Sequence, residues 1–379
     1  MKPRNVCLAC KTVFNGESDP RIRLLNRQGE QVSPDDIPTG DSEEFYNTET
    51  VPVHLVCPRD HLLMEGSATR PLVVISLFGE TRSGKDAFKN GLLSVLENHG
   101  LFYRQFSYKL HSLQLEANAA RDPLTHLAEQ TQAATMNQKH VPLHIALTDL
   151  SRDTDDKINV ALFNTGGEDN NVETGEDLRK ALPFISHTDV FVVMIPPPTL
   201  PGLPEHVRMP PGSEGDSTQS RKVTFRHIER LAEAVRDGRL AEETAALKAG
   251  QPVPEPAANP IVVFALTKCD RYVDLEGFPQ GTLLERRHDD QGLDALDIAM
   301  FNEQEALNKF VVDNGGHMLL KQAERIGKVF ITAISGTGSD REGHAASQKS
   351  ALNRCMDPLL LPLMRAGRGR MSQADIEAS

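Results

Sequence analysis

The chain has 379 residues, and because single hydrophobic cores stop growing at about 250 to 300 residues, we expect one main domain and one small module. A formal net charge of −12 and an aromatic content of 5% disfavour direct nucleic-acid binding, which needs a basic face with stacking rings, and favour protein partners. No apolar run reaches the about 18 residues of a membrane span, and residues 1–6 lack the apolar core of a signal peptide, so the sequence predicts a cytoplasmic protein without a membrane span.

A small metal-binding module is predicted at the N-terminus. Two short turns there carry thiols, with a C-x-x-C pair in the first turn and a single cysteine in the second. Two turns of soft ligands can hold zinc tetrahedrally and close a small ribbon of strands; the alternative is a set of ordinary buried thiols. The fourth ligand is His61 by residue type, or Asp60 by the spacing of a repeated C-P-x-C. The predicted zinc ribbon covers residues 1–67, with the ligands Cys7, Cys10, Cys57 and His61 and with strands at 21–26 and 51–56.

A glycine-rich loop follows the first long apolar run. The run Leu72–Phe78 predicts a buried strand, and apolar residues at helical spacing follow the loop. The loop fits G-x-x-x-x-G-K, in which backbone N–H groups wrap phosphate oxygens, the helix N-terminus adds its positive end, and the lysine reaches the terminal phosphates. The strand–loop–helix context disfavours the alternative of a glycine-rich turn that contains a lysine by chance. The predicted nucleotide-binding residues here are Gly79, Thr81, Arg82, Ser83, Gly84, Lys85 and Asp86.

A predicted hairpin leads to a second phosphate-contacting segment. A short strand is predicted at 101–108, and the later runs 143–148 and 158–163 are strand-like and are separated by a polar turn. The second run ends in a variant of D-x-x-G, a segment in which the acid holds magnesium through water and the glycine N–H meets the terminal phosphate. Gly167 would supply that N–H, and Glu168 stands where a glutamine commonly orients the attacking water.

Thr131 and Thr135 precede the hairpin and are equal candidates for the threonine of a first switch loop, against the alternative of polar residues on a surface loop. Two magnesium positions carry exchanged residue types. Asp86 stands where a Ser or Thr hydroxyl normally ligates the metal, and Asn164 stands where the aspartate of D-x-x-G would be. Because the exchange keeps one carboxylate near the metal, we hypothesise that Asp86 supplies the charge that Asn164 lacks; the alternative is simple decay of the site. Glu168 cannot donate a hydrogen bond to phosphate, so slow hydrolysis is expected.

A proline-rich segment separates the next two buried strands. The apolar runs 189–195 and 261–266 predict the strands, and the segment 196–259 is predicted as an insertion with one amphipathic helix. Inserted surface segments of this kind more often contact partners than catalyse. Helices are also expected at 293–312, 318–326 and 351–364, and residues 365–379 are expected to be a disordered tail.

The base-recognition segment follows the strand 261–266. Thr267-Lys268-Cys269-Asp270 differs from N-K-x-D at its first position. An aspartate carboxylate accepts from both N1–H and the 2-amino group of guanine, a pair of donors that adenine does not present. Ala333 lies near the end of a last apolar run, where a backbone N–H would meet O6 of the base. The predicted guanine-binding residues are Thr267, Lys268, Asp270 and Ala333.

The order of these motifs resembles that of translation-factor-related and small-switch P-loop GTPases. Within them the chain is most similar to bacterial double-GTPase-type proteins of conflict and defence systems, in which a zinc ribbon commonly precedes the G domain. The resemblance covers about residues 7–363. It implies a GTPase domain over residues 68–364 that binds GTP, GDP and Mg²⁺ and regulates partner proteins, with Lys85, Gly167 and Glu168 in catalytic positions.

The sequence therefore predicts an α/β fold: a doubly wound, mostly parallel sheet of about six strands preceded by the zinc ribbon. The leading function is a guanine-nucleotide switch that changes partner binding. A second hypothesis is a degenerate nucleotide-binding scaffold that acts through the ribbon and the insertion without turnover. A third is an ATP-using P-loop enzyme, which the segment 267–270 disfavours because its carboxylate selects guanine.

Overall fold

The computed structural model describes fifteen stretches of the chain, and all structural statements below refer to them. No helix in these stretches is long and apolar enough to cross a membrane. The described residues are 23–25, 31–32, 54–57, 72–80, 83–98, 106–111, 143–149, 157–165, 173–182, 184–208, 217–248, 260–271, 275–279, 292–335 and 358–359.

The main element is a seven-stranded sheet in the order β10-β9-β8-β4-β7-β6-β5. The first five strands of this order pair in parallel, and the last two join antiparallel. This confirms the predicted α/β class, mostly parallel sheet and hairpin, with one strand more than expected. The strands are β4 (Leu72–Phe78), β5 (Phe106–His111), β6 (Leu143–Asp149), β7 (Lys157–Asn164), β8 (Val190–Ile195), β9 (Ile261–Thr267) and β10 (Lys328–Ile334).

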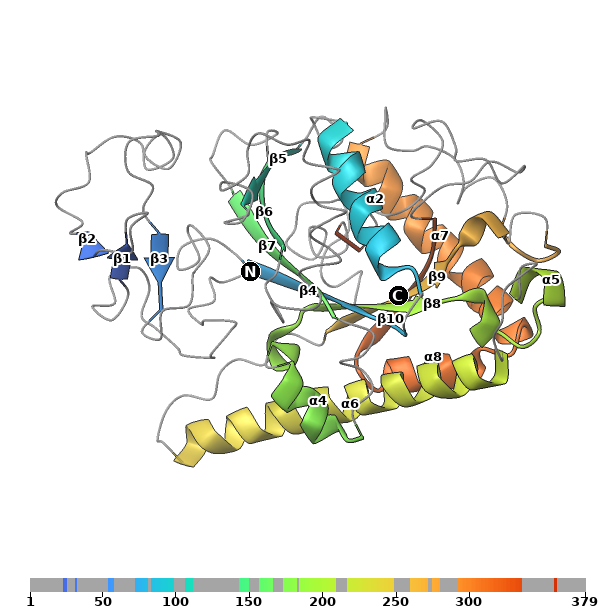
Figure 1. Cartoon of the computed structure of the whole chain (residues 1–379). Helices are drawn as coiled ribbons and strands as arrows, with labels where there is room; N and C mark the ends of the chain where they lie inside the picture. The colour runs from blue at the N-terminus through green and yellow to red at the C-terminus, as the bar shows by residue number, and fades with distance from the viewer. Residues whose placement is uncertain are drawn as a thin grey trace.

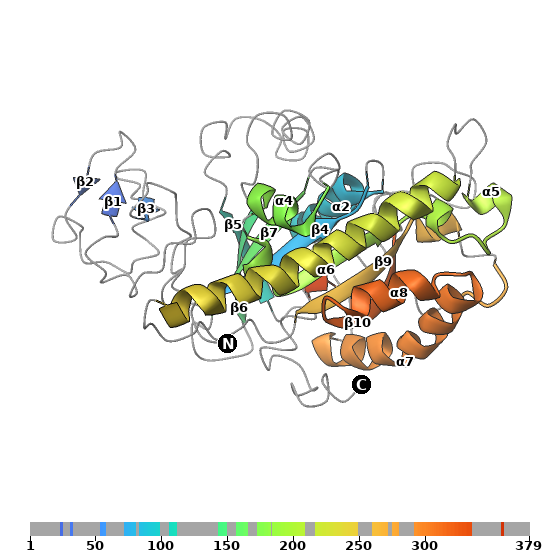
Figure 2. The same cartoon turned by 90° about the horizontal axis from the view of Figure 1, so that it is seen from below.

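Helices cover the sheet. Figure 1 shows α2 above the sheet and α4, α6 and α8 below it, and Figure 2 shows the lower layer from beneath. Three of the parallel strands are buried at every position, as expected for continuous apolar runs between helix layers. The helices are α2 (Lys85–Asn98), α4 (Gly175–Ala181), α5 (Glu205–Arg208), α6 (Ser217–Lys248), α7 (Gly292–Asp313) and α8 (His317–Glu324), with short 3₁₀ turns η3 (Ile185–His187), η4 (Pro197–Thr199) and η5 (Cys269–Arg271).

Helix α6 corrects the view of segment 196–259 as a surface addition. The helix is the crossover between β8 and β9, and its apolar stripe belongs to the main core of the domain. Ile228, Leu231 and Val235 are each at most 3% exposed. The amphipathic period was therefore predicted correctly, but its apolar face covers the sheet rather than a partner.

The amino ends of the central strands are joined by one buried carboxylate. Asp189, immediately before β8, accepts a 2.8 Å hydrogen bond from the Val74 N–H through its side chain. Its own N–H donates to Val74 O, and its carbonyl accepts from Ile261 N. Asp189 is 4% exposed, so these bonds lie in the core and fix β4, β8 and β9 at one end.

Helix α7 closes the β10 edge of the sheet. The side-chain amide of Gln304 donates to Ile331 O at 2.8 Å and accepts from Ile331 N at 2.7 Å. An edge strand otherwise leaves such backbone groups unpaired, so this amide replaces part of a missing strand.

A separate antiparallel sheet has the order β2-β1-β3. Its strands are β1 (Arg23–Leu25), β2 (Gln31–Val32) and β3 (His54–Val56). Strands were expected at 21–26 and 51–56, so two of the three were found from the sequence.

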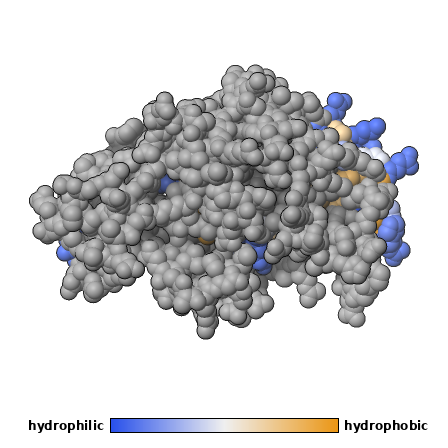
Figure 3. Space-filling view, turned by 90° about the horizontal axis from the view of Figure 1, so that it is seen from above, coloured by the Kyte–Doolittle hydropathy of each residue, from blue (hydrophilic) through white to orange (hydrophobic). Residues whose placement is uncertain are grey.

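The surface of the described part carries few large apolar side chains. In Figure 3 the described residues visible at one end are mainly hydrophilic and surround a smaller hydrophobic area.

Candidate functional site

The glycine-rich loop begins where β4 ends, at the carboxyl edge of the parallel strands. Gly79 has φ +157°, and a Cβ there would lie 2.6 Å from Ser83 Oγ and 2.9 Å from Met194 Cβ. Gly84 has φ +103°, a backbone conformation that side chains rarely allow. Both glycines are therefore required by the loop itself, as the sequence pattern predicted, and α2 begins at the next residue.

Lys85 lies folded into this loop. It is 7% exposed, and its Nζ donates to Gly79 O at 2.5 Å and to Glu80 O at 2.9 Å. A buried ammonium needs charge or hydrogen-bond compensation, and here two backbone carbonyls of the loop provide it. An oxyanion bound in the loop would meet this ammonium directly.

Asp86 and Asn164 are brought together from positions 78 residues apart. Asn164, the last residue of β7, donates from Nδ2 to Asp86 Oδ1 at 2.8 Å. Asp86 lies in the first turn of α2 and is exposed. The two residues with exchanged types thus form one oxygen-rich pair beside the loop, and carboxylate and amide oxygens are ligands that Mg²⁺ accepts. The residues present fit the predicted metal.

The segment after β9 reaches the other side of the loop. Thr267 is 3% exposed, and a Cβ built on Gly84 would lie 3.6 Å from Thr267 Cβ. Lys268 has φ +59°, the left-handed region that is uncommon for a residue with a side chain. The backbone of Asp270 follows in η5, and Arg271 Nη1 fixes this turn to Val207 O at 3.1 Å. The Asp270 side chain lies outside the described part.

Ala333 is fully buried within β10, next to β9. It pairs in register with Leu266, and Thr267 pairs with Ile334. The structure therefore places Ala333 beside the strand that carries the base-recognition segment.

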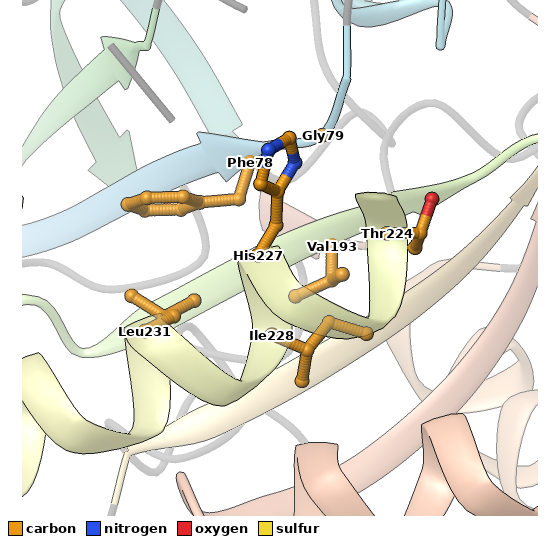
Figure 4. A pocket seen from close by; sticks show the side chains of 7 residues that line it. All are labelled: Phe78, Gly79, Val193, Thr224, His227, Ile228 and Leu231. Carbon is orange, nitrogen blue, oxygen red and sulfur yellow. The ribbon is translucent and has the colours of Figure 1, made fainter. Parts of the chain in front are cut away.

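Helix α6 supplies a face of the site that the sequence analysis missed. Ser220 Oγ donates a hydrogen bond to the Glu80 carboxylate of the loop. Further along the same helix, Thr224 and His227 line a small pocket beneath Gly79. Figure 4 shows the His227 ring rising from α6 toward Gly79 beside Phe78. The residues that line this pocket are Phe78, Gly79, Val193, Thr224, His227, Ile228 and Leu231.

Two titratable groups at this face are perturbed by their surroundings. Burial lowers the pKa of His227 to about 4, with smaller contributions from Arg230 and Lys85. Burial also raises the pKa of Glu80, while the Ser220 hydrogen bond and the positive charges of Lys85 and Lys268 act in the opposite direction. At neutral pH His227 is therefore an uncharged imidazole beside a phosphate-type loop.

Buried polar atoms without partners gather around the loop. Each of five such atoms has no hydrogen-bond partner among the described residues. A buried polar group left unpaired costs about 1 to 3 kcal/mol, so these atoms call for water or a polar ligand as their partner. One lies in the loop and one on Asn164, the residue that donates to Asp86. Two lie in the pocket below Gly79, and one lies on Thr267 beside Gly84. The atoms are Ser83 Oγ, Asn164 Oδ1, Thr224 Oγ1, His227 Nδ1 and Thr267 Oγ1.

Several predicted residues lie outside the described part of the chain and remain predictions. These are Thr81, Arg82, Thr131, Thr135, Gly167, Glu168, Asp60, Cys7, Cys10 and His61, together with residues 365–379 and most of the helix expected at 351–364.

Of the zinc ligands, only Cys57 is described. It directly follows β3 and is fully buried. The described residues contain no group of three or more potential metal-ligating side chains, and the three other predicted ligands are not among them. The zinc ribbon thus remains a prediction.

Comparison with known proteins gives a weak structural likeness. No protein-family model and no curated protein sequence matches the chain. Among solved structures, it is similar to the S. cerevisiae Ski7 GTPase-like domain bound to GDP and inorganic phosphate (TM-score 0.31, 11% identity) and to the same domain bound to GTP (TM-score 0.33, 11% identity). Both alignments cover 78% of this chain and 50% of the other, so the chain spans half the length of these structures. Because the TM-scores and the identities are low, the site's own residues must carry the functional conclusion.

Proposed function

We propose that the chain binds guanine nucleotides at the loop after β4 and hydrolyses GTP slowly, as a switch that changes partner binding. One observation supports this most directly: buried polar atoms without partners surround a loop whose glycines and lysine suit phosphate. They lie at the carboxyl edge of the parallel strands, beside β4. Strands β5 to β7 lie on one side of β4 and strands β8 to β10 on the other, so the strand order reverses at β4. Ligands of open α/β sheets bind at such switch points.

In the proposed complex the loop N–H groups and the start of α2 hold the phosphates, and Lys85 exchanges a loop carbonyl for a phosphate oxygen. Thr267 packs against the loop, and Asp270 follows the left-handed turn at Lys268. The carboxylate of Asp270 would accept two hydrogen bonds from guanine, which selects against adenine.

Asp86 and Asn164 would hold Mg²⁺. When bound, the ion would neutralise charge on the phosphates as the terminal group leaves. The hydrogen bond from Asn164 Nδ2 fixes the Asp86 carboxylate and leaves Asn164 Oδ1 as a further oxygen donor. The chain then presents one negative charge to the metal, from Asp86. The usual pair also presents one, but there the loop position is a neutral Ser or Thr and the carboxylate is the Asp of D-x-x-G. Gly167 and Glu168 would complete the phosphate contacts.

Titration of the full chain with GTP, GDP and ATP, with and without Mg²⁺, tests the proposal. Lys85→Ala should weaken GTP binding at least tenfold, since truncating one partner of a buried charge pair costs about 2 to 5 kcal/mol. Asp270→Asn should lose GTP and gain xanthosine triphosphate, because the new NH₂ donor matches a carbonyl at position 2 of xanthine but opposes the amino group of guanine. Lys85→Ala protein that binds GTP like the parent, or equal affinity of the parent for ATP, refutes the assignment.

The second candidate is a scaffold that holds nucleotide without turnover, and the exchange at Asp86 and Asn164 is the observation that favours it. Tight GTP binding with no phosphate release would support it over the switch. Protein partners, a zinc ribbon and a role in bacterial defence are expected only from the sequence resemblance.

A further inference from the structure

A carboxylate stands inside the loop proposed to bind phosphate. Glu80 follows Gly79, is partly buried, and accepts its hydrogen bond from Ser220 on α6. Two cations act on it, Lys85 from the start of α2 and Lys268 from the segment after β9. The loop pattern allows any residue at this position, so nothing in phosphate cradling calls for a negative charge there.

The charge of Glu80 opposes the ligand that the rest of the loop attracts. Lys85 Nζ lies 2.9 Å from the backbone oxygen of Glu80, so a phosphate held by Lys85 would sit within the same small region as this residue. Two like charges at such separations repel each other appreciably when partly shielded from water. The Ser220 bond gives the carboxylate a fixed position on the α6 side of the loop.

We propose that Glu80 weakens nucleotide binding by electrostatic repulsion, and that Ser220 is a positioning residue that limits this repulsion by holding the carboxylate against α6. This inference rests on the proposed function and adds a residue pair that sets its affinity. A freed carboxylate would turn toward Lys85 and compete with phosphate for the ammonium.

The pH dependence follows from the same charge. Burial raises the pKa of Glu80, and a bound phosphate would raise it further, so nucleotide binding takes up a proton. Affinity should therefore fall as the pH rises through the raised pKa of Glu80. The other groups facing this region are Lys85, Lys268 and, on α6, His227, which is uncharged above its pKa of about 4.

The test is the affinity for GDP between pH 5 and pH 8 in the full-length chain. Glu80→Gln should bind GDP roughly fivefold to tenfold more tightly at pH 7.5 and show a flatter pH profile. Ser220→Ala should weaken binding roughly threefold when Glu80 is present and have no effect beside Glu80→Gln, while Ser220→Thr, which keeps the hydroxyl, should bind like the parent. Glu305→Gln on α7, an exposed acid, is the control for the change in net charge.

The outcomes separate the two proposals. If the parent binds GDP and Glu80→Gln has the same affinity and the same pH profile as the parent, the inference is overturned and the proposed function is not. An equal effect of Ser220→Ala with and without Glu80 overturns the positioning role, and melting temperatures exclude loss of the fold as its cause. A parent that binds neither GDP nor GTP overturns the proposed function and this inference with it.

Discussion

The buried imidazole of His227 should make the fold sensitive to acid. The side chain is 8% exposed, and its burial lowers its pKa from 6.5 to about 4. The imidazole of the unfolded chain binds a proton below pH 6.5, whereas the native imidazole stays neutral until about pH 4. The contribution of His227 to the free energy of unfolding is therefore complete above pH 6.5 and is lost as the pH falls toward 4. The pKa difference, 6.5 against about 4, corresponds to about 3 kcal/mol of unfolding free energy.

Denaturant unfolding of the parent and of His227→Gln at several pH values from 7.5 to 4.5 measures this contribution. Glutamine does not titrate, so the gap between the two stability curves should narrow or reverse as the pH falls, whatever the substitution costs at pH 7.5. Glu80 acts in the other direction, because its raised pKa favours protonation in the folded state, and it is present in both proteins. His317→Gln, which replaces an exposed imidazole on α8, is the matched control. Parallel curves for the parent and His227→Gln would refute the reasoning.

Two further predictions concern the polar pairs that hold distant segments together. Asp86→Ser alone should lose Mg²⁺ affinity in the GDP-bound protein, and Asp86→Ser with Asn164→Asp should recover much of that affinity. A Mg²⁺ titration should give a coupling free energy of more than about 1 kcal/mol between the two substitutions. Additive effects would favour decay of the site. Asp189→Ala should lower the free energy of unfolding by about 2 to 3 kcal/mol, because the buried Val74 N–H loses its acceptor. In Asp189→Asn the amide oxygen still accepts, so the loss of unfolding free energy should be smaller. Equal losses in the two variants would argue against the acceptor role.

The local patterns of the sequence were enough for the central architecture. The apolar runs that became β4, β8 and β9 are buried at every position, because parallel strands between two helix layers have no solvent-facing side. A helix directly after the loop was also predicted, since glycine punctuation and helical spacing are both local, and α2 begins at Lys85 within the predicted loop. The edge strand β5 was placed too early, at 101–108 instead of Phe106–His111, because an edge strand has a weaker apolar pattern.

Long-range polar pairs were predictable only where a motif order implied the topology. The sequence placed Asp86 and Asn164 in one site because the D-x-x-G position and the loop lysine have known relative places, and the structure joins them by a hydrogen bond. The pairing of Glu80 with Ser220 spans 140 residues, and no motif contains it. It depends on α6 lying beside the loop, and the prediction of segment 196–259 as an insertion did not place the helix there.

A signal for the α6 face was nevertheless present in the helix itself. Ser220, Thr224 and His227 are spaced by four and three residues, which places them on one face of the helix, and Leu231 continues the same stripe four residues later. In an amphipathic helix this stripe should be apolar throughout, because it faces the core. Thr224 is 2% and His227 8% exposed, so the polar residues do not leave the stripe for solvent. Polar side chains along a buried stripe indicate a polar site beside the helix. Here Ser220 donates to Glu80 of the loop after β4, and Thr224 and His227 line the pocket beneath Gly79.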